Sequence, residues 1–185
     1  MQASIHRTRR GFTLVELLLV IAVSAVLIGL AVPSMQSLVL GFRARTASDT
    51  LFASMALSRS EAIKRNTRTV LCRSSDGLGC ATSGGWEQGW IVFVDSRNNG
   101  RVDPGEAILL RQQALAPDIY LTPHFTVAGY ISYTPLGWAQ TVNGAMLMGN
   151  FMVCQKSAGP VEGRKIVLSA AGRARTTRTT EAHCP

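Results

Sequence analysis

The first pattern in the chain is a long apolar run near its N-terminus. No charged residue stands between Glu16 and Arg43, so 26 consecutive positions (17 to 42) carry no charge. As a helix this run would extend roughly 39 Å, more than the hydrocarbon core of a bilayer, which is about 30 Å thick. Three arginines precede the run within the first eleven residues. The pattern therefore predicts a membrane-spanning helix with its N-terminal end in the cytoplasm.

The helical pattern continues to about Asn66. Apolar residues recur there at roughly helical spacing, with charged residues, among them Arg59, between them. We expect the charged residues to form a solvated face and the apolar ones to pack on a sheet. The expected apolar stripe comprises Leu38, Phe42, Leu51, Met55, Ala62 and Ile63.

After Asn66 the pattern changes to that of strands separated by turn-forming residues. Trp90–Val94 is continuously apolar, which is typical of a strand that is buried on both faces. A long N-terminal helix followed by seven or eight antiparallel strands predicts an α+β fold. The expected strands span residues 67–73, 90–94, 107–115, 119–122, 130–134, 145–155, 165–169 and 173–178.

Charge and cysteine content describe a basic domain whose cysteines we expect to form disulfides. The formal net charge is +8, and 8 − 3 = +5 remains without the three leader arginines. From Lys156 onward there are six basic residues against two acidic ones. An even number of cysteines in an exported domain favours disulfides. We expect the pairs Cys72–Cys80 and Cys154–Cys184, although sequence alone allows three pairings.

A short motif at the start of the apolar run resembles a known signal. The segment Gly11–Glu16 reads GFTLVE and resembles the type III signal of type IV prepilins and pseudopilins. The resemblance implies that prepilin peptidase cuts between Gly11 and Phe12 and that the new amine of Phe12 is methylated. It also implies that Glu16 neutralises the N-terminal amine of a neighbouring subunit, since a buried carboxylate is tolerable beside a cation.

Motifs in the strand region narrow this resemblance to the GspH/FimT branch of minor pilins. They are residues 90–95 with 98–100, residues 133–137 (YTPLG) and residues 163–169 (GRKIVLS). The resemblance implies a long helix that carries two β-sheets. The implied domains are a cleaved leader (1–11), a transmembrane and filament-core helix (12–42) and a periplasmic domain (43–185). The protein would cross the inner membrane once and later join an extracellular pilus with other major and minor pilins.

A basic motif near the C-terminus is the candidate binding site. Arg173 and Arg175 stand at i and i+2, so on a strand they would point the same way, and each guanidinium can fork onto a phosphate. The sequence G-R-x-R at 172–175 resembles the DNA-binding motif of FimT-type minor pilins, which serve DNA uptake in natural transformation. We predict that Arg173 and Arg175, assisted by Arg178 and Lys165, bind the backbone of double-stranded DNA without reading its sequence.

Two other interpretations of the same residues stay open. Basic side chains on an edge strand prevent edge-to-edge pairing, which is a purely structural role. They could also form salt bridges to a neighbouring pilin. The protein would then be a tip or priming subunit of the FimU type, or a type II secretion pseudopilin of the GspH type.

The remaining motifs do not predict catalysis or a metal site. Residues 95–106 nearly match calcium-loop spacing, but Arg97 stands where an oxygen ligand belongs. We interpret Asn98–Gly100 as a tight turn instead. The chain lacks the G-x-S-x-G, P-loop and H-E-x-x-H motifs, so we expect no enzyme activity and no cofactor.

Overall fold

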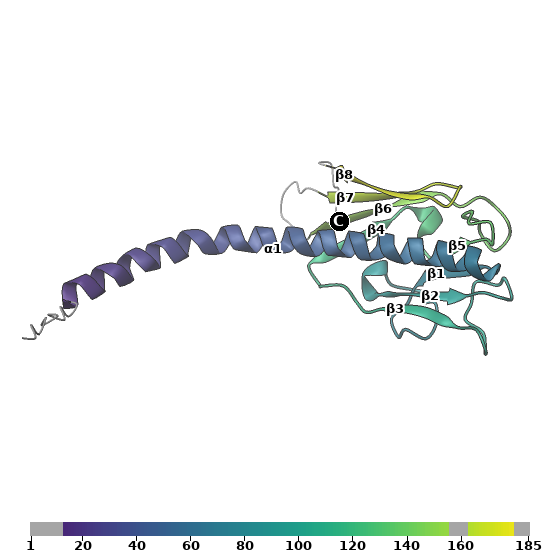
Figure 1. Ribbon diagram of the computed structural model, residues 1–185, viewed down its shortest axis with the longest axis horizontal. Coiled ribbons are helices and arrows are strands. Elements are labelled where there is room, and N and C mark those ends of the chain that lie inside the picture. Colours follow the sequence, from purple (N-terminus) through teal and green to yellow (C-terminus); the bar gives the residue numbers. More distant parts are fainter. Residues whose placement is uncertain (1–12, 156–162, 180–185) are drawn as a thin grey trace, which may run out of the picture. The chain divides into compact units, whose positions relative to one another are not determined.

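A computed structural model describes residues 13–155 and 163–179, without the side chains of residues 31–34, 36 and 37 (Figure 1). It consists of two compact units, residues 1–39 and 40–185, and helix α1 (Leu14–Arg65) contributes to both. In the first unit, every side chain whose exposure is described is exposed. None of the helices in the described ranges is both long enough and apolar enough to cross a membrane.

The second unit contains two antiparallel sheets of four strands each (Figure 1). The first sheet has the order β3–β2–β1–β5, and the second has the order β4–β6–β7–β8. The strands are β1 (Thr69–Arg73), β2 (Trp90–Val94), β3 (Ile108–Gln112), β4 (Ile119–Pro123), β5 (Tyr130–Tyr133), β6 (Gly149–Gln155), β7 (Gly163–Leu168) and β8 (Ala174–Thr179). Two 3-10 turns, η1 (Trp86–Gln88) and η2 (Phe125–Val127), complete the described elements. All eight predicted strands are present, and the α+β fold is confirmed.

The second half of α1 packs on the sheets through small side chains. Its buried residues recur three and four positions apart, which forms one helix face. They are Ala44, Ala47, Ser48, Leu51, Ser54, Met55, Ser58 and Ala62. The predicted stripe is wrong at Leu38, Phe42 and Ile63, which are exposed. Small residues bring the helix close to the first sheet, where Ser54 accepts a hydrogen bond from Trp90 Nε1 at 2.9 Å.

Strand β2 is buried on both faces, as its apolar sequence predicts. Trp90 and Val92 belong to the main core with α1 and the second sheet, while Ile91 and Phe93 belong to a smaller cluster behind the first sheet. The predicted Cys72–Cys80 disulfide is present and lies at this smaller cluster. Cys154 is also disulfide-bonded, and its predicted partner, Cys184, lies outside the described residues.

Candidate functional site

The start of α1 is fixed by a reciprocal pair of hydrogen bonds. The Glu16 carboxylate accepts the Thr13 N–H at 3.2 Å, and the Thr13 hydroxyl accepts the Glu16 N–H at 3.2 Å. This arrangement is a capping box, which satisfies two free N–H groups at the helix start. Glu16 thus has a local role in starting α1, beside its predicted role in filament assembly. The predicted cleavage site, Gly11 and Phe12, lies outside the described residues.

The β7–β8 hairpin gives the second sheet one basic outer face. Lys165 pairs with Thr177, and Val167 pairs with Arg175. Opposite residues of an antiparallel pair share a face, and neighbouring residues of a strand alternate between faces. Ile166 belongs to the main core, so Lys165 and Arg175 lie on the opposite, outer face of the sheet.

Arg178 lies on the other face of this hairpin. It pairs with Arg164, whose guanidinium is 3.7 Å from the Asp49 carboxylate on α1. Arg178 therefore points toward the helix side of the sheet, although it is only three positions from Arg175. The proximity of the two arginines in sequence does not place them on one surface, and a part for Arg178 in DNA binding stays a prediction.

Arg173 precedes β8 and lies in the β7–β8 turn. Ser169 donates to the Arg173 carbonyl from its N–H at 3.0 Å and from its hydroxyl at 3.1 Å, which closes the turn. Gly172 has a φ of +75°, and a Cβ added to it would lie 1.9 Å from the Gly137 carbonyl oxygen. The glycine of G-R-x-R is therefore required by a close approach to the turn after β5.

Four of the five basic side chains of this hairpin have no partner among the described residues, and the fifth, Arg164, is paired with Asp49. The segment 163–179 contains five basic residues and no acidic one. Among the described residues, no hydrogen bond or ion pair engages the side chains of Lys165, Arg173, Arg175 and Arg178. Lys165 and Arg175 on the outer face, with Arg173 in the adjoining turn, form the candidate binding surface, whereas Arg178 lies on the other face.

A pocket beside the arginine turn was not predicted from the sequence. Its volume is about 340 Å³, and it lies between α1 and the β7–β8 turn. Phe52, Met55 and Ile63 contribute apolar wall, whereas Arg59 and Arg173 contribute positive charge. The prediction that Arg59 belongs to a solvated face is wrong, because it is half-buried and its Nε donates to the Gly137 carbonyl at 2.9 Å. The sequence does contain a pattern that could have predicted this position. Met55, Arg59 and Ile63 are four residues apart, which places them on one side of the helix.

Tyr133 also lines this pocket and is fully buried. Its hydroxyl has no hydrogen-bond partner among the described residues. Burial raises the pKa of the Tyr133 hydroxyl well above its ordinary value, and the charge of the nearby Arg59 opposes this only in part. The hydroxyl is therefore protonated at neutral pH.

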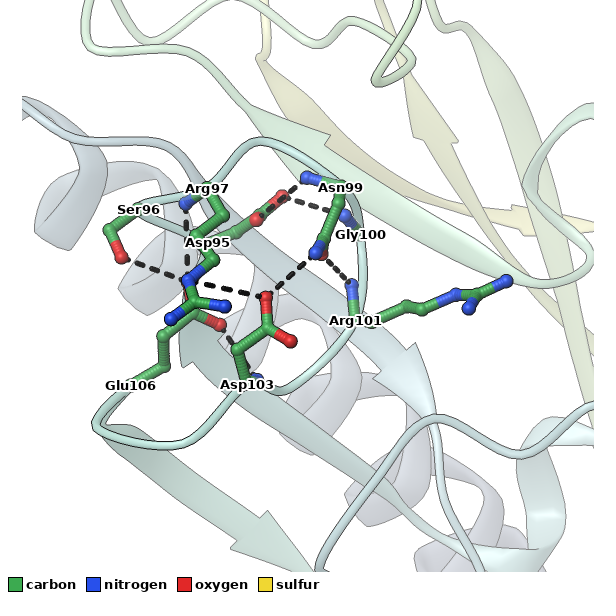
Figure 2. A network of polar contacts seen from close by, with 8 residues as sticks. All are labelled: Asp95, Ser96, Arg97, Asn99, Gly100, Arg101, Asp103 and Glu106. Atoms are coloured by element: carbon green, nitrogen blue, oxygen red, sulfur yellow. Dashed lines mark hydrogen bonds and ion pairs between the residues drawn. The ribbon is translucent and has the colours of Figure 1, made fainter.

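The loop between β2 and β3 is held by its own carboxylates (Figure 2). Asp95 accepts the N–H groups of Asn99 at 3.0 Å and Gly100 at 2.9 Å. Glu106 accepts the Ser96 hydroxyl at 2.9 Å and the Asp103 N–H at 3.0 Å. Burial raises the pKa of Glu106, but these hydrogen bonds together outweigh it and lower the pKa.

The same loop supports the turn interpretation of Asn98–Gly100. Asn98 and Gly100 have positive φ angles of 55° and 71°. The Arg97 guanidinium lies 3.8 Å from the Asp103 carboxylate (Figure 2). Within the described ranges, no group of three or more acidic, histidine or cysteine residues is arranged to hold a metal ion. The acidic residues of this loop bond protein donors.

Comparison with known proteins identifies the family. The model of the family described as type II transport protein GspH matches residues 47–172, and the prokaryotic N-terminal methylation motif matches residues 6–32. The chain is 34% identical to the pilin-like protein PilA1 of Thermus thermophilus over 175 residues, which cover 91% of this chain and 98% of the relative.

Solved structures share the fold at low sequence identity. The type IV minor pilin FimU of Pseudomonas aeruginosa aligns with a TM-score of 0.53 and 20% identity, covering 72% of this chain and 87% of FimU. The minor pseudopilin EpsH of the Vibrio cholerae type 2 secretion system aligns with a TM-score of 0.51 and 12% identity, covering 73% and 96%. Together with the helix and the two sheets, these matches show that the chain belongs to the GspH family of type IV minor pilins and pseudopilins.

Proposed function

We propose that this pilin binds extracellular DNA for uptake in natural transformation, through Lys165, Arg173 and Arg175. The observation that carries the proposal is a hairpin with five basic residues, no acidic residue and four cationic side chains without a described partner. Such cations are free to replace the counterions of a phosphate backbone. Strands β7 and β8 are the edge of a four-stranded sheet and not a separate ribbon that could enter a major groove, so we expect phosphate contacts and binding that is independent of sequence.

The proposal includes the path of the protein to the pilus. The methylation motif implies membrane anchoring and pilus assembly. We infer that the chain crosses the inner membrane once through residues 12–42, with its N-terminus in the cytoplasm, and that prepilin peptidase cuts after Gly11. The mass and the N-terminal sequence of the mature protein test this inference. A chain that begins with methylated Phe12 supports it, and any other N-terminus contradicts it.

A second candidate function is assembly without DNA. FimU and EpsH are named as a minor pilin and a minor pseudopilin, and this chain shares their fold. Exposed apolar side chains along residues 14–30 of α1 favour packing against other pilin helices. In this role the unpaired arginines would meet acidic residues of a neighbouring subunit, as in a priming pilin or a secretion pseudopilin.

A binding assay separates the two candidates. The full chain in uncharged detergent is titrated into fluorescently labelled double-stranded DNA, and anisotropy gives the affinity. We expect Arg173→Ala with Arg175→Ala to weaken binding roughly tenfold or more at low salt, because two phosphate contacts are lost. The matched control removes two other exposed arginines, Arg45→Ala and Arg101→Ala, and should change the affinity by less than about twofold.

Two different results would contradict the proposed DNA-binding surface. An equal loss in both double variants would show that net charge alone attracts DNA and would contradict the assigned surface. Absence of binding by the unaltered protein at low salt would favour the assembly function. In cells, the DNA function predicts that Arg173→Ala with Arg175→Ala abolishes transformation and leaves pili intact, whereas the assembly function predicts loss of pili.

A further inference from the structure

We propose that the pocket between α1 and the β7–β8 turn binds one unpaired nucleotide of the DNA; this inference rests on the DNA-binding function proposed above. The phosphate would lie on Arg59 and Arg173, and the base would enter the pocket. The protein would then prefer single strands and frayed ends over an intact duplex of the same length.

The positive charge of the pocket favours the binding of an anion. Arg59 and Arg173 both line it, and none of its lining residues is acidic. The Nε of Arg59 is bonded to the Gly137 carbonyl, while no described residue takes the other guanidinium nitrogens of Arg59 or the side chain of Arg173. Two arginines with free forked donors match the tetrahedral oxygens of a phosphate.

The apolar wall of the pocket suits the flat face of a base. Phe52, Met55 and Ile63 offer apolar surface, and Ile63 is 49% exposed. Bases pack on such surfaces in proteins that bind single strands. Tyr133 of β5 lines the same pocket. An aspartate or glutamate of a neighbouring pilin would satisfy the arginines but would leave the apolar wall unmatched.

The pocket is preformed by backbone contacts. Gly172 and Gly137 approach so closely that a Cβ on Gly172 would overlap the Gly137 carbonyl. Arg59 bonds the same carbonyl and so joins α1 to both turns. The volume of about 340 Å³ lies within the range of about 300–1,000 Å³ that is usual for small-ligand pockets.

The test compares strands and duplexes on the full chain in uncharged detergent. Labelled single-stranded DNA and duplex DNA of equal length are titrated with the protein, and deoxyguanosine monophosphate is titrated by calorimetry. We expect the single strand to bind roughly fivefold more tightly than the duplex. Ala56→Leu fills the pocket from α1 and should remove this preference without weakening duplex binding. Ala53→Leu is the matched control, because Ala53 is an exposed residue of the same helix that does not line the pocket.

Ile63→Ala keeps the test informative if the Ala56 variant folds poorly. Ile63 is 49% exposed, so its truncation should change the urea midpoint of unfolding only slightly. It removes apolar wall from the pocket and should still reduce the preference for single strands and the heat of mononucleotide binding.

The outcomes separate this inference from the proposed function. Duplex binding that depends on Arg173 and Arg175, without a preference for single strands or a mononucleotide signal, would overturn the pocket and leave the DNA function. Mononucleotide binding that Ala56→Leu abolishes, without DNA binding, would support the pocket and overturn the DNA function. Binding of a glutamate-rich peptide in place of the mononucleotide would overturn the inference and assign the pocket to a neighbouring pilin.

Discussion

The arginine side chains of the first sheet and those of the β7–β8 hairpin differ in their hydrogen bonds. Beside the first sheet, Arg68 donates to Asn98 at 3.0 Å and to Ser132 at 2.7 Å. In β1 itself, Arg73 donates to three carbonyls of the loop that follows, at residues 81, 82 and 84. At the β7–β8 hairpin, Arg164 is paired with Asp49, but Arg173 in the turn and Arg175 in β8 have no partner among the described residues.

The difference follows from burial. Strands β1 and β2 are covered on both faces, and a charge near such a sheet is costly unless hydrogen bonds compensate it. The outer face of the β7–β8 hairpin meets solvent, so its cations need no internal partner to be stable. Arginine content alone therefore does not indicate a candidate binding surface, and the absence of internal hydrogen bonds narrows the choice of arginines to test.

The largest effect on stability is expected at Arg68. Arg68→Ala should lower the free energy of unfolding by about 2–3 kcal/mol, because it removes charged hydrogen bonds to the buried Ser132 and to neighbouring carbonyls. Urea unfolding measures the change. The control, Arg175→Ala, should change the same free energy by less than about 0.5 kcal/mol. Equal changes in the free energy of unfolding for Arg68→Ala and Arg175→Ala would contradict the proposed difference between bonded and unbonded arginines.

Removal of the Cys72–Cys80 disulfide should have a similar but smaller effect. The bond joins positions eight residues apart and closes the loop whose carbonyls hold Arg73. Cys72→Ala with Cys80→Ala should cost about 2 kcal/mol in the free energy of unfolding. In this background, Arg73→Ala should cost less than it does in the unaltered protein, which a double-mutant cycle measures. Full additivity would show that the loop does not hold Arg73.

Tyr133 provides a pH test at the boundary between the two sheets. Because burial raises the pKa of Tyr133 in the folded protein, folding favours the protonated hydroxyl. This contribution is complete below the unfolded value of about 10 and is lost as the pH rises above it. Tyr133→Phe should gain about 1 kcal/mol at neutral pH and should lose less stability than the unaltered protein between pH 9 and 11. Parallel pH profiles of the two proteins would contradict the assignment.

Features that depend on neighbouring residues in sequence were predictable. The eight strands were found because apolar runs and turn residues are local signals, and the Cys72–Cys80 bond closes a short loop. The exposure of Leu38, Phe42 and Ile63 was not found. Periodicity identifies one face of a helix, but contact distance decides whether large or small residues fill it, and here alanine and serine do.

The candidate site was predicted only in part, for the same reason. Sequence spacing predicts a site at Arg173 and Arg175 with Arg178 assisting, and this site stays a prediction, whereas the pairing register places Arg178 on the face opposite Arg175. The pocket needs three segments that are distant in sequence, represented by Arg59, Tyr133 and Gly172. No local pattern joins these residues, because the close contact of two turns brings them together.

The salt dependence of DNA binding tests the central claim most directly. The logarithm of the association constant is measured against the logarithm of salt concentration for the full chain and for Arg173→Ala with Arg175→Ala. Each phosphate contact contributes a slope of about −0.9, so the double variant should have a slope smaller in magnitude by about 2. We expect this difference together with an unchanged urea midpoint of unfolding. Identical slopes for the two proteins would contradict it, because the two unbonded arginines would then make no contact with the DNA backbone.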